Sequence, residues 1–137
     1  MHTATLDLPI KMNAMGATVR HQPDFGTADV PFAAEHLSLA TGVDIAPLLK
    51  GLEGEACQTV HWGYLIRGRL VVSYADGSSE TCSAGDVFHW PTGHSVRVED
   101  DAELVMFSPA AGHLAVMNHM LGILAELPAS APSVVHA

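Results

Sequence analysis

The sequence predicts an all-β sandwich or barrel of short antiparallel strands, followed by one C-terminal helix. Between residues 55 and 109, runs rich in β-branched and aromatic residues alternate with glycine, proline and Asp-Gly turn signals, and no helical segment separates them. After Pro109 the apolar residues change to helical spacing. The chain of 137 residues is long enough to bury the core of one domain.

The first part of the chain differs in character from the rest. Residues 1–31 include Pro9, Pro23 and Pro31 and show no sustained periodicity, so we expect an extended arm with room for one short edge strand. The barrel and its helix are expected over 32–127, and a loose tail over 128–137. Residues 32–40 form the first expected strand of the barrel, and 44–54 a loop or short helical turn.

The later elements follow from spacing and turn residues. Further strands are expected over 57–67, 70–74, 78–83, 87–90, 95–98 and 103–107. Asp76-Gly77 suits a type I′ hairpin turn, and we expect the acidic residues 99–101 to form the turn between the last two strands. The helix is expected over 113–127, ended by Pro128, with one apolar face made by Leu114, Met117, Leu121 and Leu124.

Composition and charge exclude several classes of function. Six lysines and arginines stand against 15 aspartates and glutamates, and the basic residues are scattered, so we expect neither nucleic acid nor an anionic membrane as a partner. No apolar run reaches the roughly 18 residues that predict a membrane span. The N-terminus lacks the pattern of a secretory signal, so we expect a cytoplasmic protein with Cys57 and Cys82 as free thiols.

Residues that carry chemistry gather around residue 57. In a strand, side chains alternate between faces, so Glu55, Cys57, Thr59 and His61 would share one face. His94 follows a turn at the start of a later strand and is expected to point to the same interior. Inside a barrel, a carboxylate and an imidazole are stable when a metal or a mutual hydrogen bond satisfies them. The sequence therefore predicts a polar centre within an apolar barrel.

The spacing of these residues resembles the first motif of the cupin superfamily, G-x5-H-x-H-x3/4-E-x6-G. His61 is followed after six residues by Gly68, so His61 takes the place of the family's glutamate. Cys57 then takes the place of its second histidine and Glu55 that of its first. The opening glycine of the motif falls on Leu49 and is missing.

A second segment resembles the family's second motif, G-x5-P-x-G-x2-H. Gly85, Pro91 and Gly93 match, whereas Val96 stands at the histidine position and His94 lies two residues before it. The resemblance implies a cupin-type double-stranded β-helix, a jelly-roll barrel, with a C-terminal α-helix. Because cupins usually pair through sheet edges, it also implies a homodimer.

The resemblance further implies a divalent transition metal (Fe, Zn, Ni, Mn or Cu) held by His61, His94, Glu55 and Cys57. Two histidines with Glu55 would suit Fe(II) and dioxygen chemistry, and bonding by Cys57 would favour Zn or Cu. The plainer alternatives are a hydrogen-bonded core histidine at 61, a solvent-facing turn histidine at 94, a solvated Glu55 and an inert buried Cys57.

Two kinds of function remain open from the sequence. The first is a metal-dependent cupin enzyme acting on a small organic molecule in the barrel, as a dioxygenase or other oxidoreductase, an isomerase or a lyase, with His61 as the catalytic residue. The alternatives are a non-catalytic ligand-binding or accessory cupin, and a metal-free lyase or cyclase in which His61 is the general base. Whether His36 or His89 lines the cavity is left open, and Trp62, Tyr64 and Trp90 are expected on the outer face.

Overall fold

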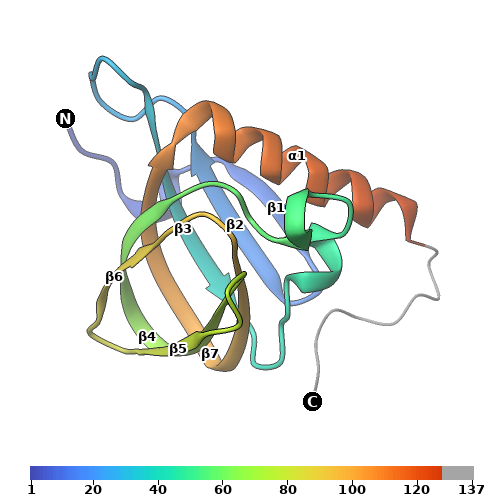
Figure 1. The fold of residues 1–137 in the computed structure, drawn as a ribbon. Helices are drawn as coiled ribbons and strands as arrows, with labels where there is room; N and C mark the ends of the chain where they lie inside the picture. The colour runs from blue at the N-terminus through green and yellow to red at the C-terminus, as the bar shows by residue number, and fades with distance from the viewer. Residues whose placement is uncertain (128–137) are drawn as a thin grey trace.

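The structure is a computed structural model that describes residues 1–127, so the tail expected over 128–137 lies outside the described residues. Antiparallel strands curl into a barrel, and one long helix lies along its side (Figure 1). This architecture confirms the predicted all-β barrel with a C-terminal helix. The elements in chain order are η1 (Thr5–Asp7), β1 (Ile10–Ala14), β2 (Ala17–Gln22), β3 (Phe32–Leu39), η2 (Ala46–Leu49), η3 (Glu53–Glu55), β4 (His61–Tyr74), β5 (Ser79–Ser83), β6 (Val87–Trp90), β7 (His94–Pro109) and α1 (Ala110–Glu126), where η marks a 3-10 helix.

The strands form one antiparallel sheet in the order β1-β2-β3-β7-β4-β5, with β6 also paired to β4. The expectation of an extended arm over 1–31 is wrong in one respect, because this segment contributes two strands rather than one edge strand. β1 and β2 form a hairpin closed by Met15 and Gly16, both at positive φ, and β2 pairs with β3 along its whole length. The flanking prolines hid the period-two burial of β2, whose alternate residues face the core.

β4 and β7 are long continuous strands, whereas the sequence analysis expected two shorter strands in place of each. The acidic residues 99–101 form no turn, because Arg69 of β4 lies opposite them: Arg69 Nε is 2.7 Å from Glu99 and Arg69 Nη2 is 3.2 Å from Asp100. These charge pairs let the acidic run remain in the ladder. The result is a long β4–β7 pair whose register shifts between residues 65 and 70.

Gly68 forms a bulge in β4 rather than its end. Its φ is +91°, and a Cβ placed there would lie 2.3 Å from the Asp101 carbonyl oxygen of β7. The buried positions of β4 change parity across this bulge, from His61 and Leu65 to Leu70 and Val72. The extra residue therefore keeps the apolar face directed inward along both halves of the strand.

The β4–β5 turn also differs from the expected type I′ geometry. Of Asp76 and Gly77, Gly77 alone has positive φ, and the Gly77 N–H donates to the Tyr74 carbonyl at 3.0 Å. This is the pattern of a type I turn followed by a glycine in the left-handed region. β5 and β6 lie close to the expected ranges, and the expected turns over 44–54 are present as η2 and η3.

α1 begins three residues earlier than expected and buries a different face. Its buried residues include His113, Val116, Met117 and Met120, whereas Leu114, Leu121 and Leu124 are only half-buried. The helix packs against η2, and His119 Nε2–H donates to the Lys50 carbonyl at 2.7 Å. α1 therefore covers the barrel beside η2 and directs a histidine inward.

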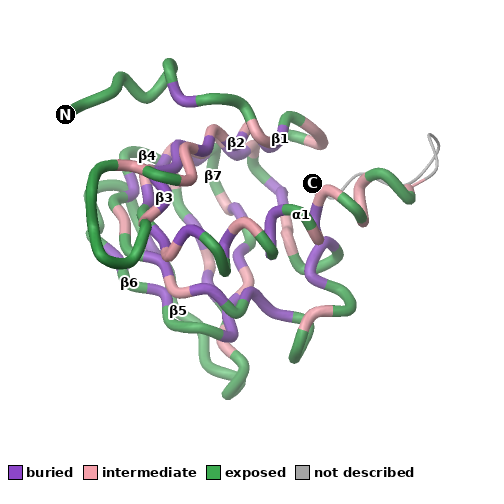
Figure 2. The backbone as a smooth tube through the Cα atoms, turned by 90° about the horizontal axis from the view of Figure 1, so that it is seen from above, coloured by how far each residue is buried: buried purple, intermediate pink, exposed green. Residues whose placement is uncertain are grey.

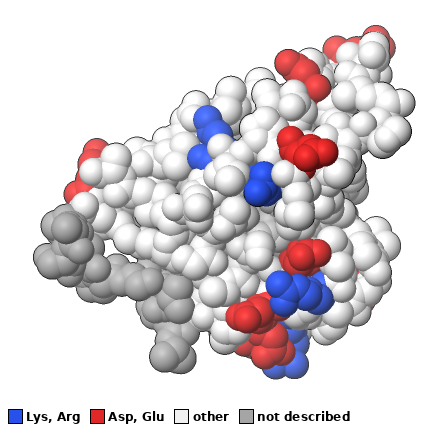
Figure 3. All heavy atoms as spheres, turned by 180° about the vertical axis from the view of Figure 1, so that it is seen from behind, with Lys and Arg blue, Asp and Glu red and all other residues white. Residues whose placement is uncertain are grey.

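Burial alternates along the strands and along α1, as Figure 2 shows, so the core fills the barrel and the space beneath the helix. On the face in Figure 3, lysines and arginines lie beside aspartates and glutamates, without an extended basic patch. No helix within residues 1–127 has the length and apolar character needed to cross a bilayer.

Candidate metal centre

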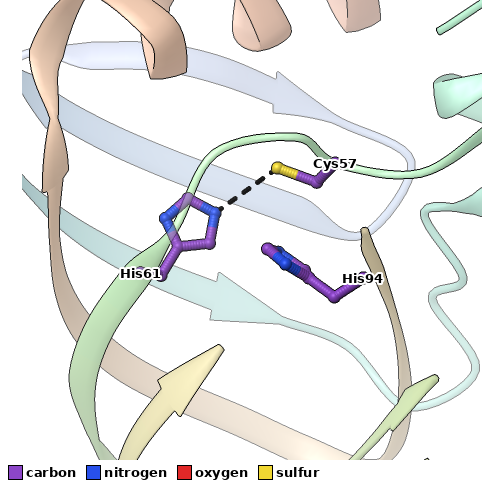
Figure 4. A group of neighbouring side chains, drawn as sticks. All are labelled: Cys57, His61 and His94. Atoms are coloured by element: carbon purple, nitrogen blue, oxygen red, sulfur yellow. Dashed lines mark hydrogen bonds between the residues drawn. The ribbon is translucent and has the colours of Figure 1, made fainter. Parts of the chain in front are cut away.

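Backbone hydrogen bonds bring Cys57 and His94 together. Their segments form an isolated antiparallel bridge in which the Cys57 N–H donates to the His94 carbonyl at 2.8 Å, and the Gly93 N–H donates to the Cys57 carbonyl at 2.7 Å. Cys57 thus lies in a loop before β4, not in a strand as expected. His61 begins β4 and His94 begins β7, so one loop and two strand ends supply three side chains that point toward one another (Figure 4).

The three side chains meet in the interior of the barrel. His61 Nε2 lies 3.6 Å from Cys57 Sγ, and the His61 and His94 ring centroids are 4.9 Å apart. One ligand atom from each residue lies within 4.8 Å of the other two. Each residue is at most 3% exposed. The enclosed pocket expected from the sequence is therefore present, with these three residues in it.

Hydrogen bonds fix the orientation of both imidazoles. His94 Nδ1–H donates to the Pro91 carbonyl at 2.7 Å, which leaves Nε2 of the neutral ring as a free lone pair. His61 Nδ1 is hydrogen-bonded to Ser108 Oγ, and its Nε2 faces the thiol. A hydrogen bond to the nitrogen remote from the ligand site is the arrangement by which proteins orient metal-binding histidines.

Burial sets the charge state of the group. It holds the pKa of His61 well below its ordinary value of 6.5, and the neighbouring His113 and His94 lower it further. Burial also lowers the pKa of His94. The same loss of water raises the pKa of the Cys57 thiol to about 11. Both imidazoles are thus neutral at neutral pH, with a protonated thiol beside them.

The residues fit a tetrahedral metal ion. On zinc, a thiolate sulfur at about 2.3 Å and an imidazole nitrogen at about 2.0 Å lie about 3.6 Å apart. The Cys57 Sγ to His61 Nε2 distance is 3.6 Å. One sulfur and two nitrogens form a donor set suited to Zn or Cu, and a cation would convert the buried thiol to the thiolate.

Glu55 does not reach this group. It lies exposed in η3 with a φ of +52°, before the loop that carries Cys57. The expected alternation over 55–61 fails because 3-10 and loop geometry replaces a strand there. The structure thus brings together His61, His94 and Cys57 but not Glu55.

The other histidines and aromatic residues considered in the sequence lie partly inside the barrel and partly on its outer face. His36 is buried beside Glu103, 3.7 Å away, and does not line the cavity. His89 is exposed and stacks on Trp62 with ring centroids 5.2 Å apart, outside the barrel. The expectation that Trp90 faces outward is wrong, because it is 2% exposed and its edge meets the His61 ring. Trp62 and Tyr64 do face outward, each 43% exposed.

Sequence analysis missed a second buried group of His21, Glu35 and His113. His21 and Glu35 are direct partners in the β2–β3 register, and His113 comes from the start of α1. His21 was overlooked because its segment was expected to be an arm. The available signal was Glu35, a carboxylate that shares the inward parity of Leu37 and Leu39 in an apolar strand.

A cavity of about 80 Å³ borders the first group and, of the second group, His113. Its walls are largely apolar and methionine-rich, and its polar lining is supplied by Cys57, His61, Trp90, His94 and His113. The volume equals that of two to three water molecules at roughly 30 Å³ each. The centre is therefore a small, mostly apolar space whose few polar groups are imidazoles, one thiol and one indole.

Comparison by sequence finds no family model and no curated protein that matches this chain. Comparison by structure does find relatives of its fold. An RmlC-like cupin from Shewanella frigidimarina NCIMB 400 matches with a TM-score of 0.57 and 17% identity over 82% of this chain and 93% of the other. Ectoine synthase from P. lautus matches with a TM-score of 0.56 and 12% identity, over 81% of this chain and 78% of the other.

A variant of oxalate decarboxylase from Bacillus subtilis also matches, with a TM-score of 0.53 and 18% identity over 79% of this chain. Only 29% of that longer protein is covered, so the chain corresponds to one part of it. At these identities the likeness concerns the fold. Together with the barrel, the Gly68 and Gly93 positions and the buried ligand group, it establishes that this chain is a small β-barrel protein of the cupin fold.

Proposed function

We propose that this protein is a metal-dependent cupin enzyme that acts on a small organic molecule within its barrel. The observation that carries the proposal is the convergence of Cys57, His61 and His94 at the cavity wall, with a sulfur–nitrogen separation of 3.6 Å that matches two ligands of one tetrahedral ion. Buried polar side chains that converge on a pocket are the usual mark of a functional site.

The donor set favours Zn or Cu over iron. The two-histidine, one-carboxylate set that suits Fe(II) required Glu55, and Glu55 is exposed outside the group. A bound Zn ion would act as a Lewis acid on a substrate oxygen or on water. His94 is held by the Pro91 carbonyl and His61 by Ser108, so this chain's residues fix the ligand geometry. We therefore place lyase or isomerase chemistry ahead of dioxygenase chemistry.

The cavity limits the substrate. A space of about 80 Å³ admits a molecule with few non-hydrogen atoms. Its apolar walls exclude water, which strengthens electrostatic interactions at the site. Two structural neighbours of this fold, ectoine synthase and oxalate decarboxylase, carry the names of enzymes, which supports an enzyme as the first proposal.

Metal analysis tests the proposal directly. Protein purified without a histidine tag should carry about one equivalent of Zn or Cu at the Cys57–His61–His94 group. His61→Ala and His94→Ala should each lose most of it, while Cys82→Ala, which removes a buried thiol outside the site, should retain it. Parent protein that binds neither Zn nor Cu when these are supplied would contradict the proposal.

A metal-free lyase or cyclase with His61 as general base is the alternative with a specific observation behind it. His61 is buried at the cavity and hydrogen-bonded to Ser108. However, a general base works best with a pKa near the working pH, and the pKa of His61 is held well below its ordinary value. Activity that survives complete chelation would favour this alternative over the metal enzyme.

We also propose that the protein is a homodimer. Large apolar side chains gather on the outer face of the sheet, and we call them the outer apolar patch: Trp62, Tyr64, Ile66, Val87 and Phe107, which are between 39% and 83% exposed. Trp62 lies opposite Phe107 and Tyr64 opposite Val87 in the strand registers, so the patch is continuous. A contiguous apolar patch on a sheet face favours contact with a second copy.

A further inference from the structure

We propose that His21, Glu35 and His113 form a second metal site, distinct from the Cys57–His61–His94 group, that binds a divalent cation through imidazole and carboxylate donors. The three residues come from β2, β3 and α1. One ligand atom from each lies within 4.8 Å of the other two. None of them lies within either of the two sequence motifs, and none is shared with the first site.

The distances between the donor atoms suit a common ion. His21 Nδ1 lies 3.2 Å from Glu35 Oε2, and His113 Nε2 lies 2.5 Å from Glu35 Oε1. Two ligands at about 2.1 Å from one ion, at right angles, lie about 3.0 Å apart. The His21–Glu35 pair already has this spacing, and the His113–Glu35 pair needs to open by about 0.5 Å, which a side-chain torsion supplies.

The buried carboxylate of this group needs a nearby positive charge to remain ionised. Glu35 is 2% exposed, and within residues 1–127 its ion-pair partners are His21 and His113, without any lysine or arginine. Burial acts to raise its pKa, yet hydrogen bonds from the two histidines leave that pKa below its ordinary value. A buried carboxylate flanked by two imidazoles, with no lysine or arginine of the described residues beside it, is a place where a metal cation would supply positive charge.

The two histidines also carry unpaired nitrogens. Among the described residues, His21 Nε2 and His113 Nδ1 are buried without a hydrogen-bond partner. Both rings are at least 96% buried, at 4% and 3% exposure. Buried polar atoms of this kind are uncommon in folded proteins. They are the ring nitrogens remote from Glu35, so His21 Nδ1 and His113 Nε2, which face the carboxylate, are the nitrogens available to an ion. His113 lines the cavity, so an ion held here would lie within reach of a molecule bound there.

The second site differs from the first in the metals it would select. Two imidazoles and a carboxylate form a harder donor set than one thiolate and two imidazoles, so it suits Fe(II), Mn(II) or Zn(II). The His61 and His113 rings meet edge to face with centroids 4.7 Å apart, so the two sites are neighbours. The second site thus has two histidines and one carboxylate, but none of its residues belongs to the His61, His94 and Glu55 set that the sequence predicted.

Cobalt(II) is the probe that separates the two sites, because only a thiolate-bound cobalt gives an intense sulfur-to-metal charge-transfer band. Metal-free full-length protein is titrated with Co(II) and followed by absorbance. We expect two equivalents to bind: one that develops the thiolate band and one that shows only the weaker d–d bands. Glu35→Gln should remove the second equivalent and keep the thiolate band, and Cys57→Ala should do the reverse.

The outcomes for the two sites are distinguishable. A parent that binds a single Co(II) with the thiolate band, in a titration that Glu35→Gln leaves unchanged, overturns the second site and keeps the first. Two equivalents without any thiolate band would contradict the first site alone. If Glu35→Gln does not fold by circular dichroism, Cys57→Ala decides: it should still bind Co(II) and show paramagnetically shifted ring signals from two histidines, and their absence at saturating Co(II) overturns the proposal.

Discussion

Cys57 carries a proton that a metal ion must displace. Burial raises the pKa of its thiol to about 11, whereas the lowered pKa values of His61 and His94 leave both rings neutral and ready to bind. A metal bound by Cys57 at neutral pH should therefore release one proton, and the apparent affinity of this group for Zn should rise about tenfold per pH unit between about pH 7 and 9. Competition titrations with a chromophoric chelator, together with proton release in weak buffer, measure this slope.

Cys82 provides the matched control for that slope. It is a second buried free cysteine, outside the ligand group. Cys82→Ala should keep the slope, and Cys57→Ala should abolish it along with most of the affinity. An affinity that does not change with pH in the parent protein would contradict a thiolate ligand.

His61 and His94 make the metal-free protein sensitive to acid. Their folded-state pKa values lie below 6.5, so as the pH falls below 6.5 the unfolded chain takes up protons that the folded chain does not. Stability is therefore retained above that pH and lost as the pH falls toward the folded pKa values, by up to about 1.4 kcal/mol per pH unit for each group. Urea unfolding in chelating buffer across this range measures the loss.

The exposed His89 serves as the control for acid sensitivity. His94→Gln should flatten the dependence of the unfolding free energy on pH, whereas His89→Gln should leave it as steep as in the parent. Equal slopes in the parent and in His94→Gln would show that His94 is not buried in its neutral form.

Glu55 is predicted to be dispensable. It lies exposed with a positive φ of 52°, a conformation that glycine adopts without strain. Glu55→Gly should leave the metal content unchanged and stabilise the protein slightly, by about 0.5 kcal/mol. Metal analysis and thermal unfolding check both parts. Loss of the metal in this variant would restore Glu55 as a ligand and contradict the site described here.

At the level of elements, the β4 bulge at Gly68 has no room for a side chain. A Cβ there would lie 2.3 Å from the Asp101 carbonyl oxygen, whereas a Cβ at Gly77, with nearly the same φ, meets nothing within 4 Å. Gly77→Ala should lower the free energy of unfolding by about 1 kcal/mol, because alanine is strained in the left-handed conformation. Gly68→Ala adds a backbone overlap and should cost about 3 kcal/mol or more.

Denaturant unfolding of the two variants measures this difference. Similar losses for Gly68→Ala and Gly77→Ala would show that β4 and β7 do not approach closely at the bulge. Because the same bulge sets the parity of His61 relative to the rest of β4, a folded Gly68→Ala protein should also bind metal less tightly than Gly77→Ala.

The sequence predicted those elements whose signals are local. Turn glycines, β-branched runs and the switch after Pro109 located most of the barrel and its helix. Prediction from the sequence failed where residues far apart in the chain determine the secondary structure. Arg69 of β4 keeps the acidic run 99–101 in a strand, and pairing with β3 makes a strand of β2. Strand alternation also placed Glu55 inward, because nothing local shows that a 3-10 turn occupies that position.

For the candidate site, the sequence predicted three residues of one group and none of the other. Cys57, His61 and His94 followed from motif spacing. However, an isolated backbone bridge to His94, rather than a strand, holds Cys57 in place. The second group depends on the β2–β3 register and on the face that α1 buries, and both are set by packing. His113 lies inward because the helix buries a face different from its leucine face.

At the scale of the whole molecule, the outer apolar patch governs association. Trp62→Lys should convert a homodimer to a monomer, because it places a charge at the centre of the proposed contact. Ile10→Lys changes another exposed apolar residue, on β1 and away from the patch, and should leave the dimer intact. Light scattering after size-exclusion chromatography gives both masses. A parent that is monomeric at high concentration would contradict the dimer.

The fold as a whole brings Cys57, His61 and His94 from a loop and two strand ends to one mostly apolar cavity, where we propose that they hold one metal ion. X-ray absorption at the zinc edge of protein loaded with one equivalent tests it most directly. We expect one sulfur neighbour at about 2.3 Å and two imidazole nitrogens at about 2.0 Å, with the sulfur lost in Cys57→Ala. A first shell of nitrogen and oxygen alone in the parent protein would contradict the account.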